Sequence, residues 1–156
     1  PEFPPFESLE GDAVVGIEPD IMKLICDKLG VEVEFVQMDF DSVLIGIQAA
    51  KYDCAMSGIT VNPDRQKNML FTDPYYNAAQ VIVVKEDSAI KSKADLAGKK
   101  CCVEGGSAGA KVATSDATVA PGVKEVTAQT DALLEVLSGA SEVAIVDMLL
   151  AKALIK

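Results

Sequence analysis

Strand-like and helix-like segments alternate along this chain, and that alternation limits the possible folds more than any other feature. Residues 16–29 carry apolar side chains at helical spacing, and Gly30 follows as a C-terminal cap. Residues 31–35 then alternate apolar and acidic side chains, which is the pattern of a strand. We therefore predict an α/β fold with mostly parallel sheets, which bind ligands at the carboxyl ends of their strands.

The same alternation continues to the end of the chain. We expect further strands over residues 52–56, 80–85, 101–103 and 143–146, and further helices at 41–49, from Asn62-Pro63, at 92–97, after the glycine-rich turn 105–109, and at 130–137. Asp41 is predicted to cap the first of these helices, and Asn62 the second. The helix over 130–137 places Leu133, Leu134 and Leu137 on one face, and Gly139 ends it.

Length and charge exclude several classes of protein. The 156 residues suffice for one domain or two small lobes, and no apolar run approaches the roughly 20 residues that span a bilayer. The net charge of −10 argues against a nucleic-acid partner and against an anionic membrane surface. The opening residues lack the basic and apolar regions of a signal peptide, so we expect any export signal to have been removed.

The four cysteines do not form a metal-binding pattern, because histidine is absent and the only close pair, Cys101-Cys102, is adjacent. We expect no metal and no cofactor. Cys26 falls on the apolar face of a helix, whereas Cys54, Cys101 and Cys102 fall in strands, and buried free thiols are the prediction.

Residues 57–67 combine a glycine, hydroxyl groups and an arginine between an apolar run and a short helix. The planar fork of Arg65 matches a carboxylate, and the Gly58 N–H can approach a ligand closely because no side chain intervenes. The hydroxyl groups of Ser57 and Thr60 can add a hydrogen bond. The alternative is a surface arginine paired with Asp64 or Asp73.

Three further features fit a small zwitterion. The turn before Ser107 and Ala108 exposes N–H groups at a helix start, which favours an anion, although it matches neither a dinucleotide fingerprint nor a P-loop. Asp147 ends a strand, either as the cap of the next helix or as a partner for an ammonium group. Phe3 and Phe40 are either core residues or pocket walls that hold an aliphatic or cationic side chain.

Several segments then resemble one family. They are PEFPPFE at the start, VVGIEPDIMKLICDKLG, MDFD, SGIT-x-N-P-x-R, FTDPYY, DLAGKK and the strand ending in Asp147. This combination resembles the bacterial extracellular solute-binding proteins, family 3, of polar amino-acid ABC transporters. The resemblance implies two lobes, each a mostly parallel sheet flanked by helices, divided here into residues 1–80 and 81–156, with a hinge near residues 78–81.

The resemblance also implies roles for individual residues. Arg65 would pair with the ligand carboxylate, Gly58 and Thr60 would bond its main-chain groups, and Asp147 would take the α-ammonium. Phe3 and Phe40 would flank the ligand side chain. Ala108 departs from the family, which usually carries a hydroxyl there. The predicted ligand-binding set is Phe3, Phe40, Ser57, Gly58, Thr60, Arg65, Ser107, Ala108 and Asp147.

The function that follows is binding rather than catalysis. The protein would deliver a polar amino acid, glutamine or a basic one, to a membrane permease. It would act in the periplasm or outside the cell, and a lipid anchor would lie outside the given chain. The family's usual first strand and its return to lobe 1 are not in this sequence, so we expect these 156 residues alone to bind weakly. The alternatives are a dehydratase on the same scaffold, with Glu104 or Glu2 as its acid–base group, and the sensor domain of a receptor.

Overall fold

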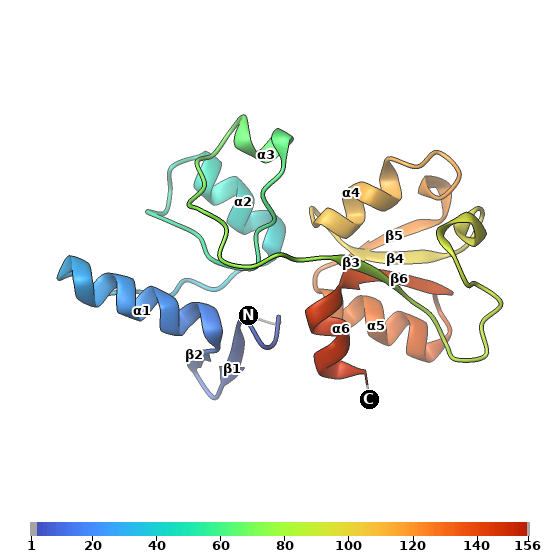
Figure 1. The fold of residues 1–156 in the computed structure, drawn as a ribbon, viewed down its shortest axis with the longest axis horizontal. Helices are drawn as coiled ribbons and strands as arrows, with labels where there is room; N and C mark the ends of the chain where they lie inside the picture. The colour runs from blue at the N-terminus through green and yellow to red at the C-terminus, as the bar shows by residue number, and fades with distance from the viewer. Residues whose placement is uncertain (1–2, 156) are drawn as a thin grey trace. The chain divides into compact units, whose positions relative to one another are not determined.

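The computed structural model describes residues 3–155, which form two compact units. Unit 1 ends at Asn77 and unit 2 begins at Ala78, as Figure 1 allows the reader to follow along the chain. Both units combine helices with strands, so the predicted α/β class is confirmed.

Unit 1 consists of a hairpin and three helices. These are β1 (Ser8–Glu10), β2 (Ala13–Val15), α1 (Ile17–Leu29), α2 (Phe40–Gln48) and α3 (Pro63–Gln66). The two strands are antiparallel, with Ser8 opposite Val15. Gly16 joins β2 to α1 with a φ of 131°, and a side chain there would overlap the carbonyl group of Phe6. Glycine is therefore required for α1 to start this close to the segment before β1.

The helix boundaries in unit 1 largely agree with the predictions. Gly30 ends α1 in the left-handed conformation, with a φ of 69°. The side chain of Asn62 accepts a hydrogen bond from the Arg65 N–H at 2.9 Å and so caps α3. The predicted cap of α2 is wrong: the helix begins at Phe40, Asp39 occupies the cap position, and Asp41 lies within the first turn.

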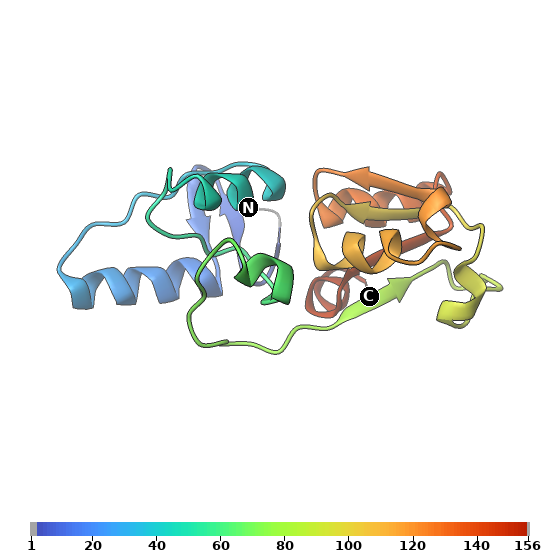
Figure 2. The same ribbon diagram turned by 90° about the horizontal axis from the view of Figure 1, so that it is seen from above.

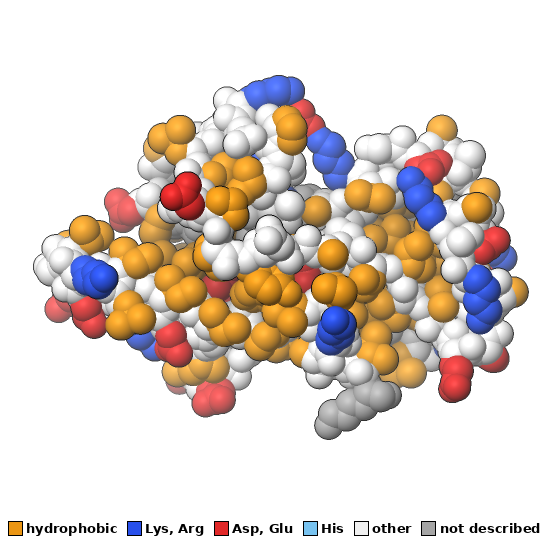
Figure 3. All heavy atoms as spheres, in the orientation of Figure 1, with side chains coloured by type: hydrophobic (Ala, Val, Ile, Leu, Met, Phe, Trp, Pro, Cys, Tyr) orange, Lys and Arg blue, Asp and Glu red, His pale blue; other side chains and the backbone are white. Residues whose placement is uncertain are grey.

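The strands predicted over residues 31–35 and 52–56 are also wrong, because both segments are irregular. In unit 1 only β1 and β2 pair among the described residues, so the parallel sheet predicted for this lobe is absent there. A strand needs a neighbouring strand for its N–H and C=O groups, whatever its side-chain pattern. Apolar side chains consequently stay exposed, and Figure 3 shows many of them over α1.

Unit 2 is a four-stranded sheet with helices on both faces. Its elements are β3 (Gln80–Val83), η1 (Lys93–Leu96), β4 (Cys101–Glu104), α4 (Ala108–Thr114), η2 (Ala120–Gly122), β5 (Val123–Val126), α5 (Gln129–Ser138), β6 (Val143–Asp147) and α6 (Met148–Leu154). The strand order is β3-β6-β4-β5, with β4 parallel to β5 and β6. The first strand, β3, is antiparallel to β6 and places Gln80 opposite Asp147. In Figures 1 and 2, α4 and α5 cover opposite faces of this sheet.

The core of unit 2 lies between the sheet and these helices. It includes Val103 and Val143 from the strands and Ala110 and Ala113 from α4. Gly109 in α4 faces the sheet so closely that a Cβ atom would lie 2.8 Å from the Ile145 carbonyl oxygen. A small residue at that position therefore sets how near α4 approaches β6.

The apolar face predicted for α5 is only partly buried. Leu133 is half-buried, Leu134 and Leu137 are exposed, and the fully buried side chains are instead those of Ala132 and Val136. Both sets of residues fit a helical period, so the sequence pattern alone cannot choose between them. The face of α5 that packs on β4 and β6 is the one that carries the smaller side chains.

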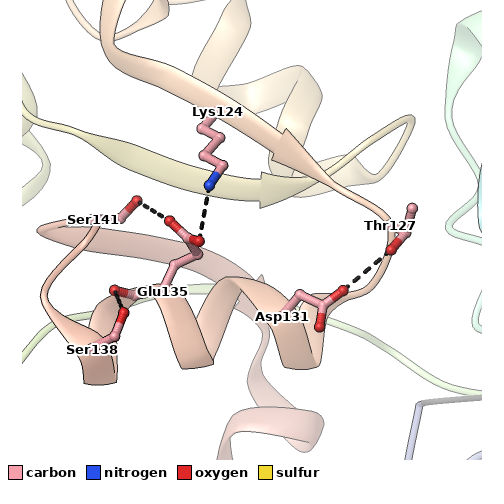
Figure 4. A network of polar contacts seen from close by, with 6 residues as sticks. All are labelled: Lys124, Thr127, Asp131, Glu135, Ser138 and Ser141. Atoms are coloured by element: carbon pink, nitrogen blue, oxygen red, sulfur yellow. Dashed lines mark hydrogen bonds and ion pairs between the residues drawn. The ribbon is translucent and has the colours of Figure 1, made fainter.

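A polar network ties α5 to β5, as Figure 4 shows. The Nζ atom of Lys124 donates to Glu135 Oε1 at 2.9 Å, and the Ser141 hydroxyl donates to Glu135 Oε2 at 3.4 Å. The hydrogen bond from Lys124 lowers the pKa of the Glu135 carboxyl. These contacts orient the partly exposed face of α5 without adding to the core.

The four thiols are free, and their burial differs between the units. Cys101 and Cys102 are buried in β4, as predicted, and burial raises the pKa of the Cys101 thiol to about 11. Cys54 is exposed, so the prediction of a buried thiol there is wrong because its segment is not a strand. Within residues 3–155, no helix is long and apolar enough to cross a membrane, and no cluster of three acidic or thiol side chains suits a metal ion.

Candidate functional site

Arg65 is the centre of the candidate site in unit 1. Its side chain is buried, with 8% of its surface exposed, so it is not the surface arginine of the alternative interpretation. Its Nη1 atom donates to the Thr60 carbonyl oxygen at 2.8 Å. The cap at Asn62 fixes the backbone of the same residue. The structure therefore brings Arg65 and Thr60 together, as the sequence predicted.

The aromatic ring of Phe40 supports the same guanidinium group. The Arg65 Cζ atom lies 5.4 Å from the centroid of the Phe40 ring, which is a cation–π distance. Phe40 is the first residue of α2, so the start of that helix contributes directly to the arginine's position. This contact orients the planar fork of Arg65 before any ligand arrives.

Phe3 lies against the loop formed by residues 57–60, here called the grip loop. Gly58 has a φ of 57°, and a Cβ atom at that position would overlap the Phe3 ring. Phe3 also stacks on Phe6 with centroids 5.3 Å apart, and Phe6 meets Tyr76 edge-on. The predicted pair Phe3 and Phe40 thus occupies two different contacts, one with Gly58 and Phe6 and one with Arg65.

Two carboxyl groups hold the grip loop, and the sequence predictions missed both. The Ser57 hydroxyl donates to Glu7 Oε1 at 2.6 Å, and the Gly58 N–H donates to Glu18 Oε1 at 2.9 Å. The hydroxyl group of Tyr75 donates to the same oxygen of Glu18. The Gly58 N–H that we expected to face a ligand is therefore used within the protein.

Glu18 is unusual because it is buried with only 1% of its surface exposed. Burial raises the pKa of its carboxyl, the charge of Glu7 adds to the rise, and the hydrogen bonds from Tyr75 and Gly58 oppose it. An acidic residue in the first turn of a helix, favoured there by the helix dipole, was the available sequence signal. Nothing in the sequence indicated that this acid would reach the grip loop.

Unit 2 contributes a second group of predicted residues. Asp147 ends β6 and is buried with 3% of its surface exposed. Its N–H donates to Gln129 Oε1 at 2.7 Å, and Gln129 Nε2 donates in turn to Glu104 at 3.2 Å. Its Oδ1 atom accepts from the Leu149 N–H at 2.9 Å, so the capping interpretation of Asp147 is confirmed. Burial raises the pKa of this carboxyl, and the N–H groups of Leu149 and Leu150 oppose the rise.

Ser107 and Ala108 lie at the start of α4, directly after the turn that follows β4. Ser107 is buried and caps the helix, with its hydroxyl oxygen accepting from the Ala110 N–H at 3.0 Å. Because β4 and β6 are parallel neighbours, their carboxyl ends meet at one edge of the sheet. The structure therefore places Ser107, Ala108 and Asp147 at the same edge, where α/β sheets bind ligands. Their contact with a ligand stays a prediction.

Comparisons with known proteins assign the chain to a family. Residues 1–150 match the family described as bacterial extracellular solute-binding proteins, family 3. The chain is 41% identical over 106 residues to the arginine-binding extracellular protein ArtP of Bacillus subtilis, covering 68% of this chain and 42% of that protein. It is 30% identical over 149 residues to the L-arginine-binding protein of Pseudomonas aeruginosa, covering 93% of this chain and 57% of that protein.

A solved structure is similar over almost the whole chain. The arginine-bound form of truncated ArgBP from T. maritima superposes with a TM-score of 0.91 at 35% identity, covering 99% of this chain and 73% of that one. These relatives are solute-binding proteins and not enzymes, and the chain spans about half the length of the two sequence relatives. The match over residues 1–150, together with a buried arginine held beside a hydroxyl-bearing loop, shows that this chain belongs to the bacterial extracellular solute-binding proteins, family 3.

Proposed function

We propose that the protein containing this chain binds a polar amino acid outside the cytoplasm and delivers it to an ABC permease. The observation that carries the proposal is the environment of Arg65. The guanidinium is buried, its Nη1 atom donates to the Thr60 carbonyl, and the Phe40 ring lies against it. A positively charged, planar fork held in this way matches a carboxylate in both geometry and charge.

The opposite end of an amino acid would be held by unit 2. Asp147 is the buried acid at the strand edge, and an ammonium group would offset the cost of ionising it there. At an effective dielectric constant of about 20, an ion pair at ~4 Å is worth roughly 4 kcal/mol before desolvation. Since the two charged residues belong to different units, a ligand that binds both would favour a closed state of the protein.

Among polar amino acids, we propose a basic one, with arginine preferred over glutamine. The Glu7 carboxyl borders the grip loop through its bond to Ser57, and Phe3 of the same segment presents an aromatic ring. A cationic side chain would gain from both the negative charge and the ring, whereas a neutral amide gains less from either. Both sequence relatives described above are named for arginine binding, which supports the same choice.

Family membership supports a proposal for location and partners. We propose an extracellular or periplasmic protein that docks on a membrane permease, and a lipid anchor outside this chain would be consistent with that task. The two bodies that close would be units 1 and 2, whose boundary after Asn77 lies three residues before the lobe boundary predicted between residues 80 and 81.

The central test is the substitution Arg65→Ala in the protein as its gene encodes it. We expect arginine affinity, measured by isothermal titration, to fall at least about 30-fold because the carboxylate loses a charged, desolvated partner. Lys67→Ala is the matched control: it removes one positive charge two residues away, from an exposed pair with Asp64. Equal affinity in Arg65→Ala and the unmodified protein would overturn the proposed site.

A second titration tests the choice of amino acid. The unmodified protein should bind arginine more tightly than glutamine, and Glu7→Gln should reduce that preference because it removes the negative charge beside Ser57. Binding of glutamine that is as tight as binding of arginine would contradict the proposed preference and leave the carboxylate site intact.

A further inference from the structure

One buried carboxyl group connects three separate segments of unit 1. Glu18 lies in the first turn of α1, and its Oε1 atom accepts hydrogen bonds from the Gly58 N–H at 2.9 Å and from the Tyr75 hydroxyl. Its Oε2 atom is buried and has no hydrogen-bond partner within the described part of the chain. Gly58 belongs to the grip loop, and Tyr75 lies in the last residues before unit 2.

The hydrogen bond from the Gly58 N–H to Glu18 fixes the orientation of a peptide plane that the loop itself would leave variable. In a trans peptide the C=O and N–H groups point in opposite directions, so a Gly58 N–H held toward Glu18 directs the Ser57 carbonyl away from it. Gly58 has a positive φ of 57°, and glycine populates many other conformations about as readily. Without the hydrogen bond from the Gly58 N–H to Glu18, the orientation of the Ser57–Gly58 peptide would be less defined.

Stability alone does not explain a carboxyl at position 18. A buried acid with one oxygen lacking a partner is costly, and an apolar side chain of the same length would avoid that cost. Burial raises the pKa of Glu18, which is the direction expected for an acid that pays this penalty. A role other than packing is therefore expected for the Glu18 carboxyl group.

We propose that Glu18 is a positioning residue for ligand binding: through the Gly58 N–H it sets the Ser57–Gly58 peptide of the grip loop, and through Tyr75 it links that loop to the segment leading into unit 2. The inference rests on the proposed function, because the loop is proposed to contact the ligand. Glu18 itself does not touch the ligand in this scheme. Its contribution is to present the loop's carbonyl groups in one fixed direction.

The variants Glu18→Met and Glu18→Gln separate positioning from packing. Methionine keeps the length of the side chain and removes both acceptors, so arginine affinity should fall about 10- to 100-fold. Glutamine keeps an oxygen that can accept from Gly58 and Tyr75, so its affinity should stay within about fivefold of the unmodified protein. Asp20→Met, an exposed position in the same helical turn, is the control and should change affinity less than about threefold.

Affinity is measured by titration well below each variant's unfolding midpoint, so that lost stability does not enter the result. Unchanged affinity in Glu18→Met would overturn the inference while leaving the proposed function in place. Failure of the unmodified protein to bind any amino acid would instead overturn the proposed function.

The hydrogen bond between the Gly58 N–H and Glu18 can also be tested by NMR without a ligand. This measurement remains available if the Glu18→Met variant does not fold. The groups that face the Glu18 carboxyl are the Glu7 carboxyl and the Tyr75 phenol. In NMR spectra, the Gly58 amide proton should shift with pH at a midpoint above the usual 4.5 of glutamate. Glu18→Gln should abolish that shift, and Glu7→Gln should lower its midpoint because the repelling charge is gone. A Gly58 resonance that ignores both pH and Glu18→Gln would overturn the inference.

Discussion

Gly58 meets two demands that no other residue type could satisfy together. Its backbone adopts a φ of 57°, and the space where a side chain would stand is filled by the Phe3 ring. Its N–H is directed at Glu18 at the same time. Glycine is therefore required here by the backbone angle and by the Phe3 ring, while its N–H makes a further contact with Glu18.

Replacing Gly58 by alanine should be more destructive than its backbone angle alone predicts. The left-handed conformation costs a non-glycine residue about 1–2 kcal/mol, and the overlap with Phe3 adds to that cost. Gly11→Ala is the control, because Gly11 has a similar φ of 62° and open space around it. Denaturant unfolding should show a larger loss of stability for Gly58→Ala, and equal losses would mean that the Phe3 ring moves aside freely.

Sequence reasoning identified Gly58 and Arg65 from residue type and spacing, and both occupy the predicted loop and helix. It did not identify Glu18 or Glu7, because an acid near a helix start or in a loop usually faces solvent. Their proximity to the grip loop depends on contacts across 40 and 50 residues of sequence. Local patterns carry no information about such contacts.

At the scale of elements, α5 has two apolar faces, and only one of them is buried against the sheet. The sheet side of the helix takes Ala132 and Val136, and the outer side keeps Leu134 and Leu137 together with the acidic groups that bond Lys124 and Thr127. Hydrophobicity alone favours the leucines for burial, so the buried face is set by how α5 packs on β4 and β6 and not by the apolar pattern of the helix.

The two faces predict opposite results for one truncation. Val136→Ala should destabilise unit 2 by roughly 2 kcal/mol, because two buried methyl groups are lost and a cavity remains. Leu137→Ala should change stability by less than about 0.5 kcal/mol, since the larger side chain is already exposed. Chemical denaturation of both variants makes the comparison, and a costlier Leu137→Ala would restore the face predicted from sequence.

Three of the four strands of unit 2 were predicted, whereas β5 and both strands of unit 1 were not. Strand partners explain why those three predictions held and why the two strands predicted in unit 1 did not. The segments 80–83, 101–104 and 143–147 find hydrogen-bonding partners in one another, so their sequence pattern is realised as a sheet. The segments 31–35 and 52–56 have the same kind of pattern but pair with nothing in the described chain. Alternation of side chains is necessary for a half-buried strand, yet only a partner makes it one.

At the scale of the whole molecule, each unit contains two of the four cysteines. The reactivity of their thiols therefore measures burial in each unit separately. Cys26 and Cys54 belong to unit 1, where Cys54 is exposed, and the buried pair Cys101 and Cys102 belongs to unit 2. The thiolate is the reactive form, so both exposure and the raised pKa of Cys101 determine the rate of alkylation.

Thiol labelling should therefore proceed in two stages. Under native conditions a maleimide should modify Cys54 first, while Cys101 and Cys102 stay protected until denaturant opens unit 2. Peptide mass spectrometry after timed quenching identifies each site. Modification of Cys101 as fast as Cys54 in the absence of denaturant would contradict the buried sheet.

The pairing of Gln80 with Asp147 has a mechanical consequence. Gln80 is the third residue of unit 2, and the Met148 N–H also bonds the Ala79 carbonyl oxygen at 2.8 Å. A force on Asp147 would therefore act through the paired strands β6 and β3 on the residues at which the chain enters unit 2. Asp147, the acid proposed to hold the ammonium group, is therefore paired with the strand on which the chain enters unit 2.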